Sequence, residues 1–153
     1  MNIIDHFHYW SHEAIIADLE DKRNNFTVVC SNLYNDFNIA TVIRNANAFL
    51  AKQVILYGSK QYDRRGTVGT HHYTNFLHTK TFTELDDRIK VLRQTYGTLK
   101  VIGIDNVPGA TAIDTFEWDS NTHYVLAFGT DMLPPTACIT MCHPSVHTVN
   151  VDC

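Results

Sequence analysis

Three polar residues stand between two apolar stretches, and their side chains are of types that bind phosphates and hydroxyl groups. Asn32, Asn38 and Arg44 follow the apolar run 26–31 and precede the apolar run 54–57. A guanidinium binds a phosphate through two parallel hydrogen bonds, whereas its pKa above about 12 keeps it from acting as an ordinary base. The amide of Asn38 could orient a hydroxyl group or the Arg44 guanidinium.

Each of the three residues also has a simpler explanation. Asn is among the residues most favoured at a helix N-cap, so Asn38 could only begin a helix. Arg44 could be a solvated residue on that helix. Asn32 is readily a turn former that supports its loop.

The densest basic stretch of the chain follows the second apolar run. It mixes cationic and aromatic side chains, namely Lys60, Tyr62, Arg64, Arg65, His71, His72 and Tyr73. Arginines here would hold RNA phosphates, and the tyrosines would stack on unpaired bases. A solvated loop is the alternative. The predicted RNA-binding residues are Asn32, Arg64, Arg65 and His71.

Four potential zinc ligands lie close together near the end of the chain. Cys138, Cys142, His143 and His147 supply the two Cys and two His that some structural zinc sites use. Their spacing is tighter than in zinc fingers, and one short segment would have to supply all four. Buried thiols with surface histidines are the preferred interpretation, and we predict no metal site.

The elements that position these residues follow from hydrophobic patterning. Continuous apolar runs predict strands at 26–31, 54–57, 75–80, 100–105 and 123–128. Helical spacing predicts helices over 8–23, 38–50 and 82–96, with Ser11 and Asn38 as N-caps and Gly97 as the last helix's end. Residues 58–74 between them are predicted to form a long loop, and loops of that length are commonly functional.

Strands and helices alternate, and the strands are apolar throughout. Both features predict a three-layer α/β fold with a mostly parallel sheet covered on both faces. Ligands of such sheets bind beyond the carboxyl ends of the strands. The segments expected at that edge are 31–38, 58 onward, 105–109 and 129 onward.

Length and composition restrict the class of protein. With 153 residues, 44% of them hydrophobic and 18% charged, the chain is expected to be a single globular domain rather than a disordered or coiled-coil chain. No apolar run reaches the roughly 18 residues that a membrane span needs. The N-terminus has no signal-peptide pattern, so we expect a cytoplasmic protein with free cysteine thiols and no membrane partner.

The net charge of −4 is unevenly distributed. All 12 Lys and Arg lie at or before Lys100, whereas residues 101–153 carry only acidic charges. A polyanion must therefore contact the first two thirds of the chain. The overall charge disfavours a sequence-blind nucleic-acid binder, but it allows an enzyme that holds RNA at one local basic patch.

The residues 31–58, SNLYNDFNIATVIRNANAFLAKQVILYG, resemble the first motif of the SpoU (TrmH) branch of the SPOUT RNA methyltransferases. The two Asn and the Arg discussed above stand at that motif's spacing. Further along, 63–70 resembles the family's glycine-containing loop, and 105–109 and 124–129 resemble two later strand ends. The likeness covers about residues 26–131.

The resemblance implies a reaction, a fold and an assembly. The reaction is methyl transfer from S-adenosyl-L-methionine to a ribose 2′-hydroxyl of tRNA or rRNA, with no role for DNA. By analogy with the family, Arg44 would activate the hydroxyl, with Asn38 beside it at the reaction centre. The fold would be a SPOUT-like α/β knot, and the protein would be a homodimer with sites built from both copies.

After Gly129 the sequence departs from the family pattern. The family's final motif is matched either by 145–151 or not at all, in which case 142–149 corresponds to an earlier strand. The resemblance places the cofactor against Phe128, Gly129, Thr130, Val149 and Asn150. We therefore expect one SpoU-type domain over 1–153, with a helical extension at 1–25 and a divergent tail at 131–153. A truncated tail would leave the knot incomplete and weaken cofactor binding.

Two other functions stay open. The chain could be a catalytically inactive family member that serves as an RNA-binding or dimerisation module. An unrelated flavodoxin-like protein is disfavoured, because no Gly-rich or Ser/Thr-rich phosphate loop follows the first strand.

Overall fold

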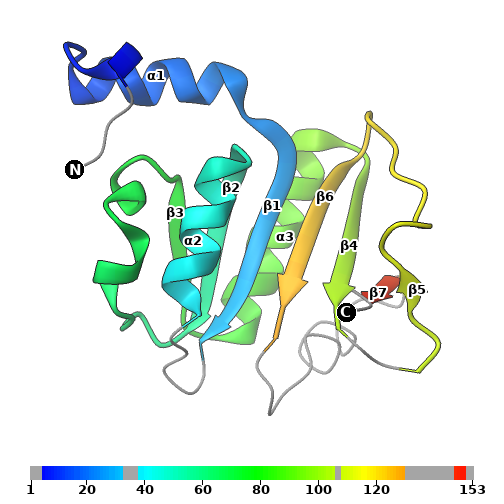
Figure 1. Cartoon of the computed structure of the whole chain (residues 1–153). Helices are drawn as coiled ribbons and strands as arrows, with labels where there is room; N and C mark the ends of the chain where they lie inside the picture. Colours follow the sequence, from blue (N-terminus) through cyan, green and yellow to red (C-terminus); the bar gives the residue numbers. More distant parts are fainter. Residues whose placement is uncertain (1–4, 33–37, 106–107, 130–146, 151–153) are drawn as a thin grey trace.

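A parallel sheet forms the centre of the molecule, with helices on both faces (Figure 1). The computed structural model describes residues 5–32, 38–105, 108–129 and 147–150. The seven strands are β1 (Asn24–Asn32), β2 (Ala51–Gly58), β3 (Phe76–Thr79), β4 (Leu99–Ile104), β5 (Thr111–Ala112), β6 (His123–Phe128) and β7 (His147–Asn150). They pair in the order β3-β2-β1-β6-β4-β7-β5, and every pairing is parallel.

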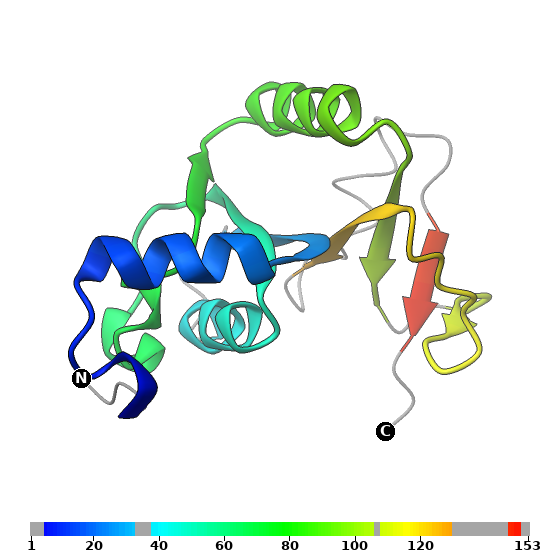
Figure 2. The same cartoon turned by 90° about the horizontal axis from the view of Figure 1, so that it is seen from above.

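The three-layer α/β prediction is confirmed. Helix α2 (Ile39–Ala48) covers one face of the sheet and α3 (Phe82–Tyr96) covers the other, as the view from above shows (Figure 2). Strands β5 and β7 are additions to the predicted set. The strand β7 overlaps both 142–149 and 145–151, so the two alignments of the tail stay alternatives. The predicted knot depends on the path of residues 130–146, which lie outside the described residues.

Two of the three predicted helix-capping residues act as predicted, and the third does not form a side-chain cap. The Ser11 hydroxyl accepts a hydrogen bond from the Ala14 N–H at the start of α1 (His12–Lys22), as predicted. Gly97, at a φ of 71°, ends α3. Asn38 occupies the N-cap position of α2, but its side chain makes no capping hydrogen bond.

The first helix is shorter than the predicted range 8–23. Trp10 precedes α1 rather than belonging to it, and 42% of it is exposed. Ile15 is the only residue of α1 that is buried. The helix is held to the domain chiefly at its carboxyl end and through contacts described below.

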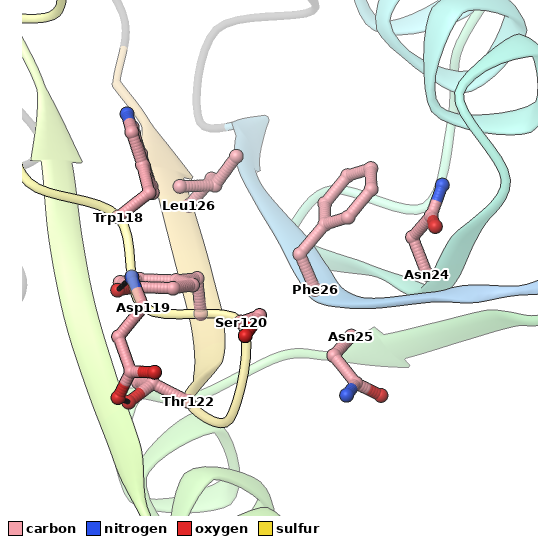
Figure 3. Close-up of a pocket in the computed structure, with 9 residues that line it drawn as sticks. Asn24, Asn25, Phe26, Trp118, Asp119, Ser120, Thr122 and Leu126 are labelled. Carbon is pink, nitrogen blue, oxygen red and sulfur yellow. Dashed lines mark hydrogen bonds between the residues drawn. The ribbon is translucent and has the colours of Figure 1, made fainter.

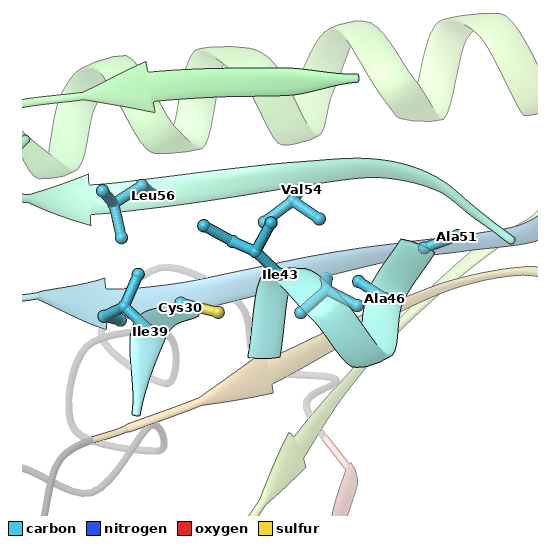
Figure 4. Close-up of a cluster of buried hydrophobic side chains, with 8 residues drawn as sticks. Cys30, Ile39, Ile43, Ala46, Ala51, Val54 and Leu56 are labelled. Atoms are coloured by element: carbon cyan, nitrogen blue, oxygen red, sulfur yellow. The ribbon is translucent and has the colours of Figure 1, made fainter. Parts of the chain in front are cut away.

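The core has two main parts, one on each face of the sheet. On the α2 face, a cluster of small and branched side chains fills the space between α2 and strands β1 and β2 (Figure 4). Its buried members are Val28, Cys30, Ile39, Ile43, Ala46, Ala51, Val54 and Leu56. On the α3 face the buried members are Val29, Ile55, Leu85, Ile89, Val101, Val125 and Ala127. Successive residues of β1 and β2 alternate between the two clusters, so both faces of these strands are apolar.

Candidate active site and the surface around it

Asn32 holds the loop that follows β2. Its side chain is fully buried, and the amide nitrogen donates to the carbonyl oxygens of Ser59 at 2.9 Å and Gln61 at 2.8 Å. The Ser59 N–H in turn donates to the Asn32 carbonyl at 2.8 Å. This geometry supports the loop-forming interpretation of Asn32, because a buried amide engaged in this way does not face a bound RNA.

The loop from 58 to 74 is ordered by two short 3-10 helices, η2 (Arg64–Thr67) and η3 (Thr70–His72). The buried Thr67 joins them, because its hydroxyl lies 2.7 Å from the Arg64 carbonyl and 2.6 Å from Nδ1 of His71. The hydroxyl has one hydrogen, which it donates to the carbonyl, so Nδ1 of His71 must supply the hydrogen of the second bond. Thr70 and Thr74 add further hydroxyl-to-carbonyl bonds within the loop.

Helix α2 carries this loop along one stripe of its surface. A Cβ on Gly66 would lie 2.7 Å from the Cβ of Ala40, so the loop approaches the helix too closely for a larger residue. Nearly two turns further along α2, Oδ1 of Asn47 lies 3.5 Å from Thr74 Oγ1. Arg44 lies four residues after Ala40 and three before Asn47, which places it on the same face of α2. Arg44 therefore belongs to the side of the helix on which the loop packs.

The three arginines of this region differ in their partners. Arg44 and Arg64 are exposed and make no side-chain hydrogen bond or ion pair with any other described residue. Arg65 is also exposed, but its Nε and Nη2 donate to the Asp63 carboxylate at 3.0 Å and 2.8 Å. These hydrogen bonds lower the pKa of Asp63, which therefore stays ionised and neutralises Arg65. The predicted pair of phosphate-binding arginines is thus unequal, with Arg64 the more available.

His71 adds no charge to this surface at neutral pH. Burial, followed by the positive charges of His72 and Arg64, lowers the pKa of His71 below its ordinary value. The ring is therefore neutral at pH 7 and serves to join η2 to η3.

Four of the five residues predicted to contact the cofactor lie at the carboxyl edge of the sheet. Ile104, the last residue of β4, pairs with Phe128 of β6 on one side and with Val149 of β7 on the other. Adjacent strands are about 4.8 Å apart, so the backbones of Phe128 and Val149 are separated by roughly 10 Å. Gly129 follows Phe128, and Asn150 ends β7. Strand ends of this kind fit an extended ligand bound by backbone groups. The fifth residue, Thr130, lies outside the described residues.

A groove that the sequence analysis missed crosses β1 and β6 on the α2 face, near the amino ends of the strands (Figure 3). It has a volume of about 510 Å³, and a neighbouring hollow of about 500 Å³ shares its lining residues Asn24, Phe26 and Leu126. The exposed rings of Trp118 and Phe49 stand at its two ends. The sequence signal for this groove was the apolar run of β6, whose residue Leu126 lines both hollows.

Two predicted absences concern the described residues alone. These residues contain no group of three or more His, Cys, Asp or Glu placed to hold a metal ion. Cys138, Cys142 and His143 fall outside them. No helix in the described ranges is long and apolar enough to cross a membrane.

Comparisons with known proteins point to one group of enzymes. No curated protein matches the chain by sequence. Among solved structures, the SpoU methyltransferase AviRb from Streptomyces viridochromogenes, in complex with AdoMet, has a TM-score of 0.67 and 24% identity over 86% of this chain. The A. aeolicus TrmH/SpoU tRNA modifying enzyme gives 0.68 and 15% over 93%, and an RNA 2′-O ribose methyltransferase gives 0.64 and 18% over 83%. This chain covers 50%, 72% and 46% of those three chains.

Their low identity means that these structures show a shared fold. The sequence itself matches the SpoU rRNA Methylase family over residues 25–132, from the start of β1 to beyond the end of β6. This range includes α2, the loop with η2 and η3, and the first strand ends of the candidate cofactor site. The chain therefore belongs to the SpoU rRNA Methylase family.

Proposed function

We propose that this protein transfers a methyl group from S-adenosyl-L-methionine to a ribose 2′-hydroxyl of tRNA or rRNA. The observation that carries the proposal is the position of Arg44. It is an exposed guanidinium without a carboxylate partner in the described structure, on the stripe of α2 that carries the Arg64 loop. Family membership and the fold shared with an RNA 2′-O ribose methyltransferase support the same reaction.

In this proposal Arg44 and Arg64 bind phosphates of the RNA, and Arg44 also acts at the reacting ribose. A hydroxyl becomes a nucleophile only as its proton leaves, and a guanidinium does not accept that proton. The phosphate oxygen bound by Arg44 is therefore the proton acceptor, and Arg44 holds it against the hydroxyl. Asn38 begins α2 six residues earlier, about 9 Å along the helix axis, where its amide orients the ribose.

The cofactor site is proposed at the carboxyl edge of the sheet. S-adenosyl-L-methionine supplies, when bound, a methyl group attached to a positively charged sulfur. Phe128 and Gly129 at the end of β6 and Val149 and Asn150 at the end of β7 would contact it, together with Thr130. Asn32 acts indirectly, by holding the loop after β2 in place.

The groove over β1 and β6 supports a homodimer. Phe49, which is 69% exposed, lines one end of this apolar groove. A twofold axis would place Phe49 of each copy in the groove of the other, so that one surface supplies both the protruding ring and its pocket.

Sedimentation velocity tests this assembly. Phe49→Asp is expected to convert dimers into monomers, because it would place a charge in an apolar interface. Val91→Asp is the matched control, since Val91 is a 50% exposed residue of α3 on the opposite face. Equal sedimentation of Phe49→Asp and the wild-type protein would exclude the groove as the interface.

The reaction itself is tested with methyl-labelled S-adenosyl-L-methionine and with tRNA and rRNA as acceptors. We expect label in a 2′-O-methylated nucleoside after digestion, and none when the acceptor nucleotide is replaced by its 2′-deoxy form. Label on a base would overturn the proposed reaction. Absence of label together with absence of cofactor binding in a calorimetric titration would instead identify the protein as an inactive RNA-binding or dimerisation module.

A further inference from the structure

A row of aromatic and imidazole rings runs from the N-terminal segment to the loop between β2 and β3. Before α1, in and after the short helix η1 (Asp5–Phe7), Trp10 contacts Phe7 and His6 at ring-centre distances of 5.4 Å and 5.3 Å. At the start of α1, His12 lies 5.0 Å from the ring of Tyr73 and 6.3 Å from that of His72. Figure 2 shows this N-terminal segment, in dark blue, beside the two green helices of the loop.

Several of these rings are exposed, as is that of Tyr9, and we call Tyr9, Trp10, His12 and His72 the ring surface. Tyr9 is 94% exposed and Trp10 is 42% exposed. Tyr9 and Trp10 belong to no core cluster, whereas His12 and His72 also join the start of α1 to η3. A concentration of exposed rings on one surface is characteristic of a binding site.

The ring surface is continuous with the surface proposed to bind RNA. His72 lies in η3 with its ring centre 4.1 Å from that of His71, and His71 is hydrogen-bonded to Thr67 of η2, the helix that contains Arg64. The same loop packs on the stripe of α2 that contains Arg44. An RNA bound by these two arginines would therefore extend over the rings.

The chemistry of the ring surface favours bases over phosphates. It contains no Lys or Arg, and the neighbouring Arg65 is paired with Asp63. Aromatic and imidazole rings stack on the faces of bases, which are accessible in single strands and covered in a duplex. We propose that the ring surface stacks on unpaired bases, so that the RNA substrate presents a single-stranded segment or loop beside the nucleotide held by Arg44 and Arg64. This inference rests on the proposed function.

The two tryptophans of the chain, Trp10 and Trp118, make a direct test possible. In the Trp118→Phe protein, Trp10 is the only tryptophan, and a ten-nucleotide oligoadenylate RNA is expected to quench its fluorescence with a saturable titration. A blunt RNA duplex of the same length is expected to quench it much less. In the Trp10→Phe protein, the emission of Trp118 is expected to stay unchanged with either RNA.

Affinity measurements give the second part of the test. The double variant Tyr9→Ala/Trp10→Ala is expected to bind the oligoadenylate at least tenfold more weakly, as the loss of two stacked bases predicts. Val91→Ala is the control, because that side chain is 50% exposed and lies on α3, on the face of the sheet opposite to α2. Thermal unfolding of all variants identifies any that lose the fold.

Three results would overturn the inference. One is unchanged Trp10 emission while methyl transfer to RNA proceeds, which leaves the proposed function standing. Another is dissociation of a homodimer by Tyr9→Ala/Trp10→Ala with unchanged RNA affinity, which would assign the rings to a second copy of the chain. The third is absence of binding by any RNA to the wild-type protein, which overturns the proposed function as well.

Discussion

Arg23 and Arg44 lie in two regions of the same domain and have opposite environments. Arg23, between α1 and β1 at the amino edge of the sheet, has a side chain that is 1% exposed and donates to the Glu20 carboxylate at 2.6 Å. It also donates to the carbonyl oxygens of Ala51 at 2.9 Å and Tyr73 at 2.7 Å. Arg44 is exposed on α2 and has no such partner among the described residues.

The contrast distinguishes stability from binding. At the amino edge, a buried guanidinium is saturated by one carboxylate and two carbonyls that belong to α1, β2 and the end of the 58–74 loop. On the surface formed by α2 and that loop, Arg44 and Arg64 keep their donors for groups outside the described chain. Buried polar groups that lose their partners are costly, whereas exposed cations contribute little to stability. The two regions should therefore respond in opposite ways to mutation.

Replacement of Arg44 is expected to give the largest effect. Arg44→Ala should lower kcat for RNA methylation by about 10³-fold, because it removes the group that holds the proton acceptor. Its free energy of unfolding should change by less than about 0.5 kcal/mol, as is usual for exposed residues. Single-turnover methyl transfer and denaturant unfolding measure the two quantities. Arg88→Ala on α3, an exposed arginine of the opposite face, should change neither.

The reverse result is expected at Arg23. Arg23→Ala should lower the free energy of unfolding by about 3 kcal/mol, since two carbonyl oxygens lose a buried donor and Glu20 loses its cation. Urea unfolding measures the loss, and the fraction that remains folded should still methylate RNA. A loss below about 1 kcal/mol would show that water replaces the guanidinium and that the two arginines are not in contrasting environments.

Much of this fold could be predicted from local sequence signals. The strand cores follow from continuous apolar runs and the carboxyl end of α3 follows from Gly97, because these signals act within a few residues. The bounds of β1 and β2 extend beyond the predicted runs. Pairing with β6 and with each other extends them, since a strand grows as far as its neighbour offers hydrogen bonds.

The candidate site was less predictable, because its properties depend on contacts between distant residues. The sequence shows Arg64 and Arg65 as equals, and only the geometry of Asp63 separates them. The burial of Asn32 depends on carbonyl oxygens of the loop after β2, 27 and 29 residues further along.

The amino edge also predicts a response to pH. His123 is buried, stacks on Tyr96 at 3.9 Å and lies 2.9 Å from the Thr27 hydroxyl. Burial, with a smaller effect of the positive Lys52, lowers its pKa from 6.5 to about 4. Between pH 6.5 and 4 the unfolded chain binds a proton that the folded protein does not. The free energy of unfolding should therefore decrease as the pH is lowered from 6.5 to 4. This group contributes at most about 1.4 kcal/mol per pH unit.

Urea unfolding of wild type and His123→Gln across pH 7 to 4 isolates this contribution. The variant keeps a polar group near Thr27 but does not titrate, so its stability should fall less steeply than that of the wild-type protein. Parallel curves for wild type and His123→Gln would mean that the histidine is protonated without cost in the folded protein.

The smallest effect is expected in the 58–74 loop, where the adjacent residues Arg64 and Arg65 can be compared. Arg64→Ala should weaken binding of RNA about fivefold at low salt, and Arg65→Ala should weaken it less, because Asp63 already occupies the Arg65 guanidinium. Asp63→Asn should strengthen binding by roughly threefold, since it removes a negative charge and frees Arg65 for a phosphate. Fluorescence anisotropy with labelled RNA at two salt concentrations measures all three variants. Equal losses of affinity for Arg64→Ala and Arg65→Ala, with no gain for Asp63→Asn, would mean that the Asp63–Arg65 ion pair opens when RNA binds. The ion pair in the free protein would then not predict how much each arginine contributes to RNA affinity.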